Sequence, residues 1–242
     1  MWDFVIVLAL ALLPAAGNTI GSLLAESMHT PKWLVGAALH AAAGIAIALV
    51  SIDLMPRILE SVSTATMVAA FLSGAGVSVL LVQGAKGLQL RLGAGSASAW
   101  MVQLAILVDL ASDGLMTGAG SGISLGLGLL LALAQLVANI PGGFASTANF
   151  RDKGMGKRQR LIIMALVPLL VLVSAGLGFG LLKDADMGVQ HAVLAVMVGV
   201  LLLTTVEETL PQGDAPQPPR WISTTAFAGG FALFALLSSL VG

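Results

Sequence analysis

The sequence contains no cysteine and has few charged residues. The absence of cysteine excludes disulfide bonds and thiolate metal sites. Asp, Glu, Lys and Arg together make up 10% of the 242 residues, whereas soluble domains contain about 25%. So few charges cannot cover the surface of a soluble protein of this length. The composition therefore predicts that lipid surrounds most of the chain.

Long apolar runs take the place of the missing charges. Hydrophobic residues make up 57% of the sequence, and the mean hydropathy is +0.99. The run 161–182 exceeds the roughly ten residues of a membrane-barrel strand and suits a helix, which needs roughly 20 apolar residues to cross a bilayer. We therefore expect an all-α polytopic membrane protein with a single transmembrane domain over residues 1–242. Its eight expected spans are residues 3–24, 33–55, 65–85, 98–117, 122–147, 159–182, 189–206 and 221–241.

The basic residues predict how these helices are oriented. If the N-terminus lies outside, nine Lys and Arg residues fall in loops facing the cytoplasm and two in outer loops, an asymmetry typical of short loops. The nine are Lys32, Lys86, Arg91, Arg151, Lys153, Lys157, Arg158, Arg160 and Arg220; the two are Arg57 and Lys183. The pattern predicts a multi-pass protein of the cell membrane, of the bacterial inner-membrane type, with both termini outside.

Two segments have a second interpretation. Residues 1–17 resemble a signal peptide, but they carry Asp3 and no Lys or Arg, so we expect them to begin the first span. The basic loop 150–160 could bind nucleic acid or anionic lipid, but the charge asymmetry favours an orientation signal, so no nucleic-acid partner is expected. Each tryptophan lies at an expected helix start, where interfacial indoles are found. These are Trp2, Trp33, Trp100 and Trp221.

Two carboxylates lie in the middle of the fourth expected span. Asp109 and Asp113 are four residues apart, so they share one helix face and repel each other. An ionisable group at the bilayer centre costs about 2.5–3.5 kcal/mol on insertion scales, which makes it a functional candidate. In a low dielectric one carboxylate stays protonated unless a cation lies between them. The pair predicts a site for a cation or for protons; the structural alternative is that both hold helices together by hydrogen bonds.

Other polar residues lie in or at the ends of the spans. Asn139 lies deep in the fifth span, where it is either a cation ligand or a residue that holds two helices together by an ordinary hydrogen bond. His40 lies inside the second span and is more often a packing residue than a ligand. Asp53 lies near the outer surface, where we expect it to be solvated beside an entrance. Glu207 and Glu208 end the seventh span at the inner surface, either solvated or receiving an ion.

Helix-breaking residues follow the polar ones closely. Gly114 follows Asp113, and Pro141, Gly142 and Gly143 follow Asn139. A proline frees a backbone carbonyl one turn back, and such carbonyls often line ion sites in transporters. The fifth span is therefore expected to be a packed helix with an irregular centre.

In these segments the chain resembles the Zrt-, Irt-like protein (ZIP) family of divalent-metal transporters. That family has eight spans with both termini outside. Its fourth-span core, His-Asn-x-Pro-Glu-Gly, is replaced here by Asp-Leu-Ala-Ser-Asp-Gly at 109–114. Its fifth-span core corresponds to Ala-Asn-Ile-Pro-Gly-Gly at 138–143, and its seventh-span His-Glu-x-x-Pro to Glu-Glu-Thr-Leu-Pro at 207–211. The resemblance is distant but covers nearly the whole chain, in the same order and spacing, and it implies a ZIP-like helix bundle.

Several positions depart from the family's metal ligands. Asp109 replaces a His, Asp113 keeps a carboxylate, and Asn139 fits the pattern. Ligand positions are lost at Leu110, Ala138, Gly142 and Val167. A bridged two-metal centre is therefore not expected. A single cation held by Asp109, Asp113 and Asn139 would have hard oxygen ligands, which suit manganese or magnesium better than zinc, although zinc affinity can still win.

The resemblance implies a membrane transporter that carries a divalent metal cation through a mid-membrane site between the fourth and fifth helices. His40, Asp53, Glu207 and Glu208 would lie on its pathway. Two alternatives stay open: a ZIP-like scaffold that carries a different, proton-coupled or organic solute, and a non-transporting membrane subunit. No His-Glu-x-x-His helix or Ser/His pair indicates an enzyme, no tightly bound cofactor is expected, and the sequence leaves open whether copies form a homo-oligomer.

Overall fold

The computed structural model describes residues 2–28, 31–92, 97–152 and 154–241. Most of these residues are helical and none lies in a β-strand, which confirms the all-α prediction. The helices are α1 (Trp2–Ser27), α2 (Lys32–Leu49), α3 (Met55–Ser61), α4 (Thr64–Leu92), α5 (Ala97–Ile123), α6 (Leu125–Asp152), α7 (Lys157–Leu182), α8 (Met187–Thr204), α9 (Leu210–Asp214) and α10 (Arg220–Val241). Two π-helical segments join them, η1 (Val50–Leu54) between α2 and α3 and η2 (Thr205–Thr209) between α8 and α9.

Most helices are longer than the sequence predicts. The expected loop 118–124 is largely helix, since α5 continues to Ile123 and only Ser124 separates it from α6. The expected seventh span continues beyond residue 206 through η2 and α9 to Asp214. Apolar content marks where lipid begins, whereas backbone hydrogen bonding continues into the polar ends, so hydropathy alone places helix ends too early.

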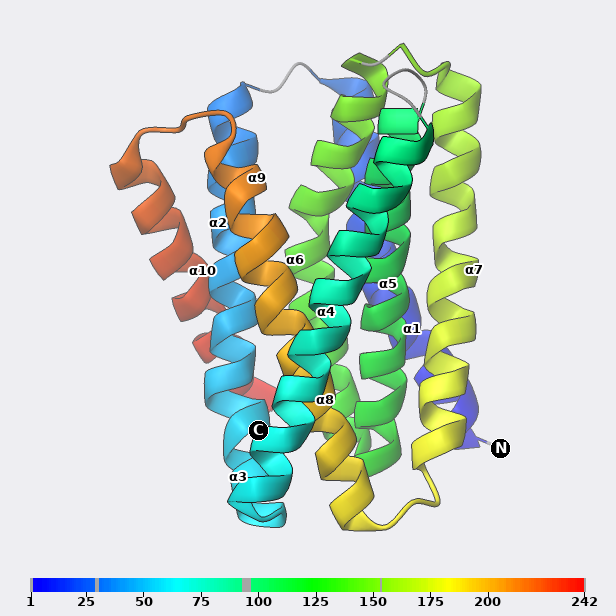
Figure 1. The fold of residues 1–242 in the computed structure, drawn as a ribbon, viewed down its shortest axis with the longest axis vertical. Helices are drawn as coiled ribbons and strands as arrows, with labels where there is room; N and C mark the ends of the chain where they lie inside the picture. Colours follow the sequence, from blue (N-terminus) through cyan, green and yellow to red (C-terminus); the bar gives the residue numbers. More distant parts are fainter. Residues whose placement is uncertain (1, 29–30, 93–96, 153, 242) are drawn as a thin grey trace.

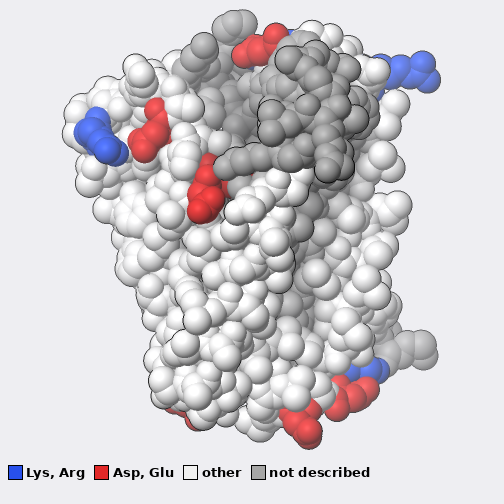
Figure 2. Space-filling model, in the orientation of Figure 1, with Lys and Arg blue, Asp and Glu red and all other residues white. Residues whose placement is uncertain are grey.

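Within the described residues, six helical stretches are long and apolar enough to cross a membrane. They are Trp2–Ser27, Trp33–Ser61, Leu125–Asp152, Lys157–Leu182, Met187–Asp214 and Arg220–Leu240. Large apolar side chains point away from the protein along them; on α7 these include Leu166, Leu169, Val173, Leu177 and Leu181. Figure 2 shows the charged residues gathered towards the two ends of the molecule, with a broad uncharged band between them. These features are those of a multi-pass membrane protein.

The helices form two groups, α1, α5, α6 and α7 in one and α2, α4, α8 and α10 in the other (Figure 1). Within the groups the closest pairs are α1 with α6, α5 with α7, α2 with α10, and α4 with α8. The two members of each pair run in the same direction. The groups meet mainly where α2 lies against α6 and where α5 lies against α4 and α8.

The same glycine contact holds all four pairs together. A Cβ built on Gly21 of α1 would lie 1.9 Å from the Ile140 carbonyl oxygen of α6, and one on Gly143 of α6 would lie 2.0 Å from the Asn18 oxygen of α1. Gly21 and Gly143 are thus partners, and each packs against the carbonyl oxygen of the residue three positions before the other glycine. The other three pairs repeat this with Gly118 and Gly178, Gly44 and Gly230, and Gly74 and Gly199. Small residues that let helix backbones approach closely are a main source of helix association in lipid.

The repeated contacts reveal an inverted internal symmetry. Gly44 and Gly199, Asp53 and Glu208, and Pro56 and Pro211 are each 155 residues apart, so the α2–η1–α3 rod matches α8–η2–α9. The glycine pairs likewise match α1 with α7, α4 with α10 and α5 with α6. Matched helices run in opposite directions in Figure 1. Inverted repeats of this kind recur in secondary transporters, whose binding sites lie where the repeats meet.

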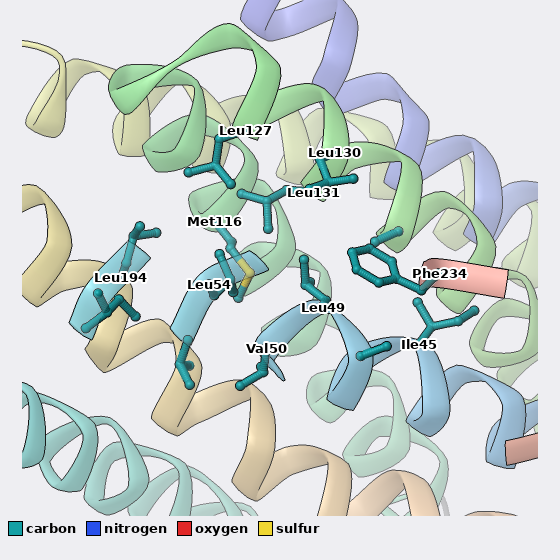
Figure 3. Packing of buried hydrophobic residues seen from close by; sticks show 14 of the residues in the cluster. Ile45, Leu49, Val50, Leu54, Met116, Leu127, Leu130, Leu131, Leu194 and Phe234 are labelled. Atoms are coloured by element: carbon teal, nitrogen blue, oxygen red, sulfur yellow. The ribbon is translucent and has the colours of Figure 1, made fainter. Parts of the chain in front are cut away.

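A buried apolar cluster packs the second group of helices against α5 and α6 (Figure 3). Leu49, Val50 and Leu54 enter it from α2 and η1, and Phe234 enters it from α10. Leu127, Leu130 and Leu131 of α6 complete the side opposite α2. A second, smaller cluster joins α1, α5 and α7 around Leu110 and Val171. The polar residues of α5 and α6 therefore lie between these two apolar clusters.

The residues used to predict orientation lie at both ends of the bundle. Lys183 follows the end of α7, whereas Arg57 lies within α3 rather than in the expected loop, and Arg151 and Lys157 flank the α6–α7 turn at the other end. Trp2, Trp33 and Trp221 lie at or next to the first residue of α1, α2 and α10. Lys153 and the side chains of Lys32, Lys86, Arg91 and Trp100 lie outside the described residues.

Candidate functional site

Asp113 lies at the centre of the first helix group. It is 7% exposed, and its Oδ2 accepts a hydrogen bond of 2.7 Å from Nδ2 of Asn139 on α6. The same nitrogen of Asn139, itself 8% exposed, lies 3.4 Å from the carbonyl oxygen of Pro14 on α1. The structure thus brings together two of the three residues predicted to hold a cation. Because the Asn139 amide donates to Asp113, only its Oδ1 is left to approach a cation in this arrangement.

Asp109 lies one turn away on α5, on the side facing the second helix group. Its side chain is exposed near the middle of the helix, although other parts of the protein lie close around it. Glu208 of η2 lies close enough for its charge to repel that of Asp109. Asp109 likewise repels Asp113. Repulsion therefore links Asp113, inside the first helix group, through Asp109 to Glu208 of the second group.

The irregular backbone lies elsewhere than the sequence predicts. α6 is continuous through Pro141, and α5 is continuous through Gly114, so the expected irregular centre of the fifth span is wrong. Gly114 and Gly143 instead allow close helix packing, and Gly142 has open space beside it. Neighbouring helices can satisfy the backbone groups that a proline frees, so a proline in a membrane helix need not break it. The two π-segments carry the irregularity, one in each half of the symmetric pair.

Each π-segment carries a carboxylate at the matched position. Asp53 is the fourth residue of η1 and Glu208 the fourth of η2. Asp53 is 9% exposed and its Oδ2 has no hydrogen-bond partner, so the expectation that it is solvated is wrong. The rod carrying it packs against α6, α8 and α10, which covers a position that the sequence places near the surface. Glu207 is exposed and Glu208 is partly buried.

Buried polar residues extend the site along the first helix group. Towards the end near the α5–α6 turn, the Thr117 hydroxyl donates to Gln135 Oε1 at 2.6 Å, and Nε2 of the buried Gln135 has no partner. Towards the other end, Ser22 and Ser146 hydroxyls donate to the Gly143 carbonyl at 3.3 and 3.1 Å. Sequence reasoning missed these residues. A four-residue spacing along α1, at Pro14, Asn18, Ser22 and Glu26, is the signal that could have found them.

A small cavity continues this polar stripe between α1, α6 and α7. It is lined by Asn18, Ser22, Ser146, Thr147, Phe150, Arg160, Ile163, Met164 and Val167. Arg160 also forms a two-pronged ion pair with Glu26, in which Nη2 donates to Oε2 at 2.9 Å. Arg151 donates to the Ala25 carbonyl at 2.7 Å. These contacts tie together the ends of α1, α6 and α7, so two of the basic residues that predict orientation also have a structural role.

His40 lies apart from the central carboxylates, about halfway along α2, where α2 faces α9. Its ring Nδ1 is 2.8 Å from the Gly36 carbonyl oxygen, and its Nε2 is 3.4 Å from Oδ1 of Asp214. Arg220 Nη1 approaches the same oxygen at 3.6 Å. The sequence placed Asp214 in a polar connection without a role, because nothing local shows that α9 folds back over α2.

Among the described residues, no three His, Asp or Glu side chains stand close enough to hold one metal ion together. A cation at the central site would therefore have Asp109 and Asp113 as its charged ligands and would need carbonyl or water oxygens to complete its shell. The sequence matches no protein-family model and no curated protein. The ZIP-like resemblance therefore stays a prediction.

Proposed function

We propose that the protein is a membrane transporter that moves a divalent cation through a site at Asp109 and Asp113, between the two helix groups. The observation that carries the proposal is the position of Asp109. Its exposed carboxylate lies in the middle of a long helix, beside the buried Asp113 and near Glu208 of the other helix group. Three repelling carboxylates at that depth are costly when unoccupied, and a divalent cation removes the repulsion.

The membrane arrangement we propose has eight spans. Six are the stretches named above, and α4 and α5 are the other two. The 29 residues of α4 and the 27 of α5 correspond to roughly 40 Å of helix, enough to cross a bilayer. Both lie beside proposed spans, α4 along α8 and α5 along α7. Residues 64–80 of α4 are apolar.

Movement of one helix group against the other would expose the site alternately. The two groups are each held internally by glycine contacts, and Asp109 and Glu208 lie on opposite sides of the junction between them. Glu207 and Glu208 would receive the ion on the inner side and Asp53 would lie on the outer side, at matched positions of the inverted repeats. Transporters built from such repeats work by rocking one repeat against the other around a fixed site.

A second candidate function is the transport of a proton-coupled or organic solute on the same scaffold. The observation that favours it is the small number of charged ligands at the centre, since the described residues hold no three-ligand cluster. Binding of a metal distinguishes the two candidates. A ligand that binds the native state raises the free energy of unfolding by mass action.

Divalent cations should raise the melting temperature of the purified protein. We expect manganese and zinc to do so in a concentration-dependent way, and vesicles containing the protein to take up the same ions. At 100 times the dissociation constant the stabilisation is about 2.7 kcal/mol, or roughly 5–11 °C for a chain of this size. Calcium-free monovalent buffer is the control. No shift with any divalent ion at millimolar concentration would favour the second candidate.

The orientation can be tested with single cysteines, because the sequence has none of its own. We expect Gln159→Cys, in the first turn of α7, to resist an impermeant thiol reagent in intact cells, and Met187→Cys, at the start of α8, to react. Both positions are exposed and uncharged, so neither change alters the Lys/Arg asymmetry. Rapid labelling at position 159 with none at 187 would invert the proposed orientation.

A further inference from the structure

The hydrogen bonds of His40 fix which of its ring nitrogens carries hydrogen. Nδ1 lies 2.8 Å from the Gly36 carbonyl oxygen, and a carbonyl can only accept, so Nδ1 is the donor. In a neutral ring Nε2 is then a bare acceptor. Nε2 faces Oδ1 of Asp214, which is also an acceptor. Two acceptors repel each other, and a positive charge relieves that repulsion; a proton on Nε2, the nearby Arg220 or a metal ion bound by both atoms can supply it.

The distance between the two atoms leaves room for a metal ion bound by both. A charged N–H···O hydrogen bond is about 2.7–2.9 Å long, whereas Nε2 and Oδ1 are 3.4 Å apart. Two ligands of a tetrahedral zinc ion, each bound at about 2.0–2.2 Å, lie about 3.3–3.5 Å from each other. A metal-binding histidine usually donates its other ring N–H to a carbonyl or carboxylate, as His40 does to Gly36.

The surroundings hold the ring in this position. A Cβ built on Gly213 would lie 2.8 Å from His40 Nδ1, and one on Gly36 would lie 2.5 Å from the Gly213 carbonyl oxygen. The imidazole therefore packs against Gly213 of α9, and the backbones of α2 and α9 approach closely at Gly36. The His40 side chain is 8% exposed, while that of Asp214 is 52% exposed, so a rigid ligand meets one that water and ions can reach. Arg220, which approaches Asp214, is 84% exposed and can move away.

We propose that His40 and Asp214 form a second cation site, between α2 and α9, for a divalent transition metal such as zinc. Water molecules complete its coordination shell, so exchange is fast and affinity is modest. Asp214 lies six residues after Glu208, about 9 Å farther along the helical rod. If the proposed transport function holds, on which this role rests, the site is where an ion leaving Glu208 pauses before release to the cytoplasm.

The test is zinc binding by equilibrium dialysis of the full chain in detergent. His40→Gln and Asp214→Asn should each remove one bound zinc per chain. His191→Gln is the matched control, because His191 is also buried and its Nδ1 makes the same bond, 2.8 Å to the Met187 carbonyl oxygen, and this variant should bind as the wild type does. Equal zinc binding by wild type and His40→Gln up to millimolar concentration would overturn the proposal.

Two further measurements separate the alternatives. The variant Asp109→Asn, Asp113→Asn should keep the zinc that depends on His40, and this result is the same whether or not the central site binds metal. In nitrogen NMR of the wild type labelled at histidine, the His40 Nε2 resonance should move to a metal-bound position when zinc is added. A resonance that stays protonated throughout the zinc titration would show that the pair is an imidazolium–carboxylate ion pair and would overturn the metal site.

Discussion

Replacing both central carboxylates by amides, as Asp109→Asn, Asp113→Asn, should abolish cation uptake by vesicles and leave a folded protein. The amides keep the size of the side chains, and an asparagine at position 113 still has an oxygen to accept the bond from Asn139, which is 2.7 Å long in the native site. The change removes the repulsion between Asp109 and Asp113 and that between Asp109 and Glu208. The melting temperature in metal-free buffer should therefore be equal or higher, and its dependence on divalent ions should disappear.

The matched control is Asp184→Asn, Asp186→Asn, which removes two exposed carboxylates at the α7–α8 turn. That variant should transport as the wild type does. Asn139→Ala should weaken uptake less than the double change, since an amide holds a cation less strongly than a carboxylate does. Normal uptake by the double variant would exclude Asp109 and Asp113 from transport. A double variant that no longer folds would assign them a structural role instead.

Adding one methyl group at a paired glycine should destabilise the protein strongly. In Gly74→Ala the new Cβ would lie 1.9 Å from the Val196 carbonyl oxygen of α8. A backbone oxygen cannot turn aside as a side chain can, so the helices must separate along their whole contact. We expect a loss of about 3 kcal/mol, the upper end of typical overpacking costs, and a melting temperature lower by roughly 6–12 °C.

Each helix pair supplies a control one or two residues away. Gly76 lies on α4 with nothing within 4 Å of a built Cβ, so Gly76→Ala should change the melting temperature little or raise it through better helix propensity. The comparisons of Gly178 with Gly180 and of Gly230 with Gly229 repeat the test on α7 and α10, because Gly180 and Gly229 also face open space. Equal melting temperatures for Gly74→Ala and Gly76→Ala would contradict the glycine-mediated pairing.

The glycine variants and the carboxylate variant should change the melting temperature in different ways, and this difference locates the transport site. The glycine variants should lose stability with or without metal, whereas the carboxylate variant should lose only the metal-dependent part. This contrast follows from the burial of the two kinds of residue. The glycines hold backbone against backbone, while the side chain of Asp109 is exposed.

The hydrophobic pattern predicted the helices and their order because a span must be apolar over roughly 20 residues wherever it packs. The spacing of Asp109 and Asp113 predicted a shared helix face, since four residues make about one turn. Both are local properties of a single helix. The prediction of an irregular backbone around Pro141 was wrong, because neighbouring helices decide whether a carbonyl freed by proline finds a hydrogen-bond partner. Those neighbours are distant in sequence.

The sequence by itself determined an all-helical, lipid-embedded chain with acidic residues in the middle of one helix, because lipid admits few other structures. The tertiary structure decided which carboxylates face each other, that Asp53 is buried, and that Asp214 lies beside His40. It also decided which glycines hold helices together, since Gly74 and Gly76 look alike along the chain and differ only in what stands opposite them. Helix pairing depends on contacts between residues 60 or more positions apart, such as Gly118 and Gly178, and no local pattern encodes which surfaces will meet.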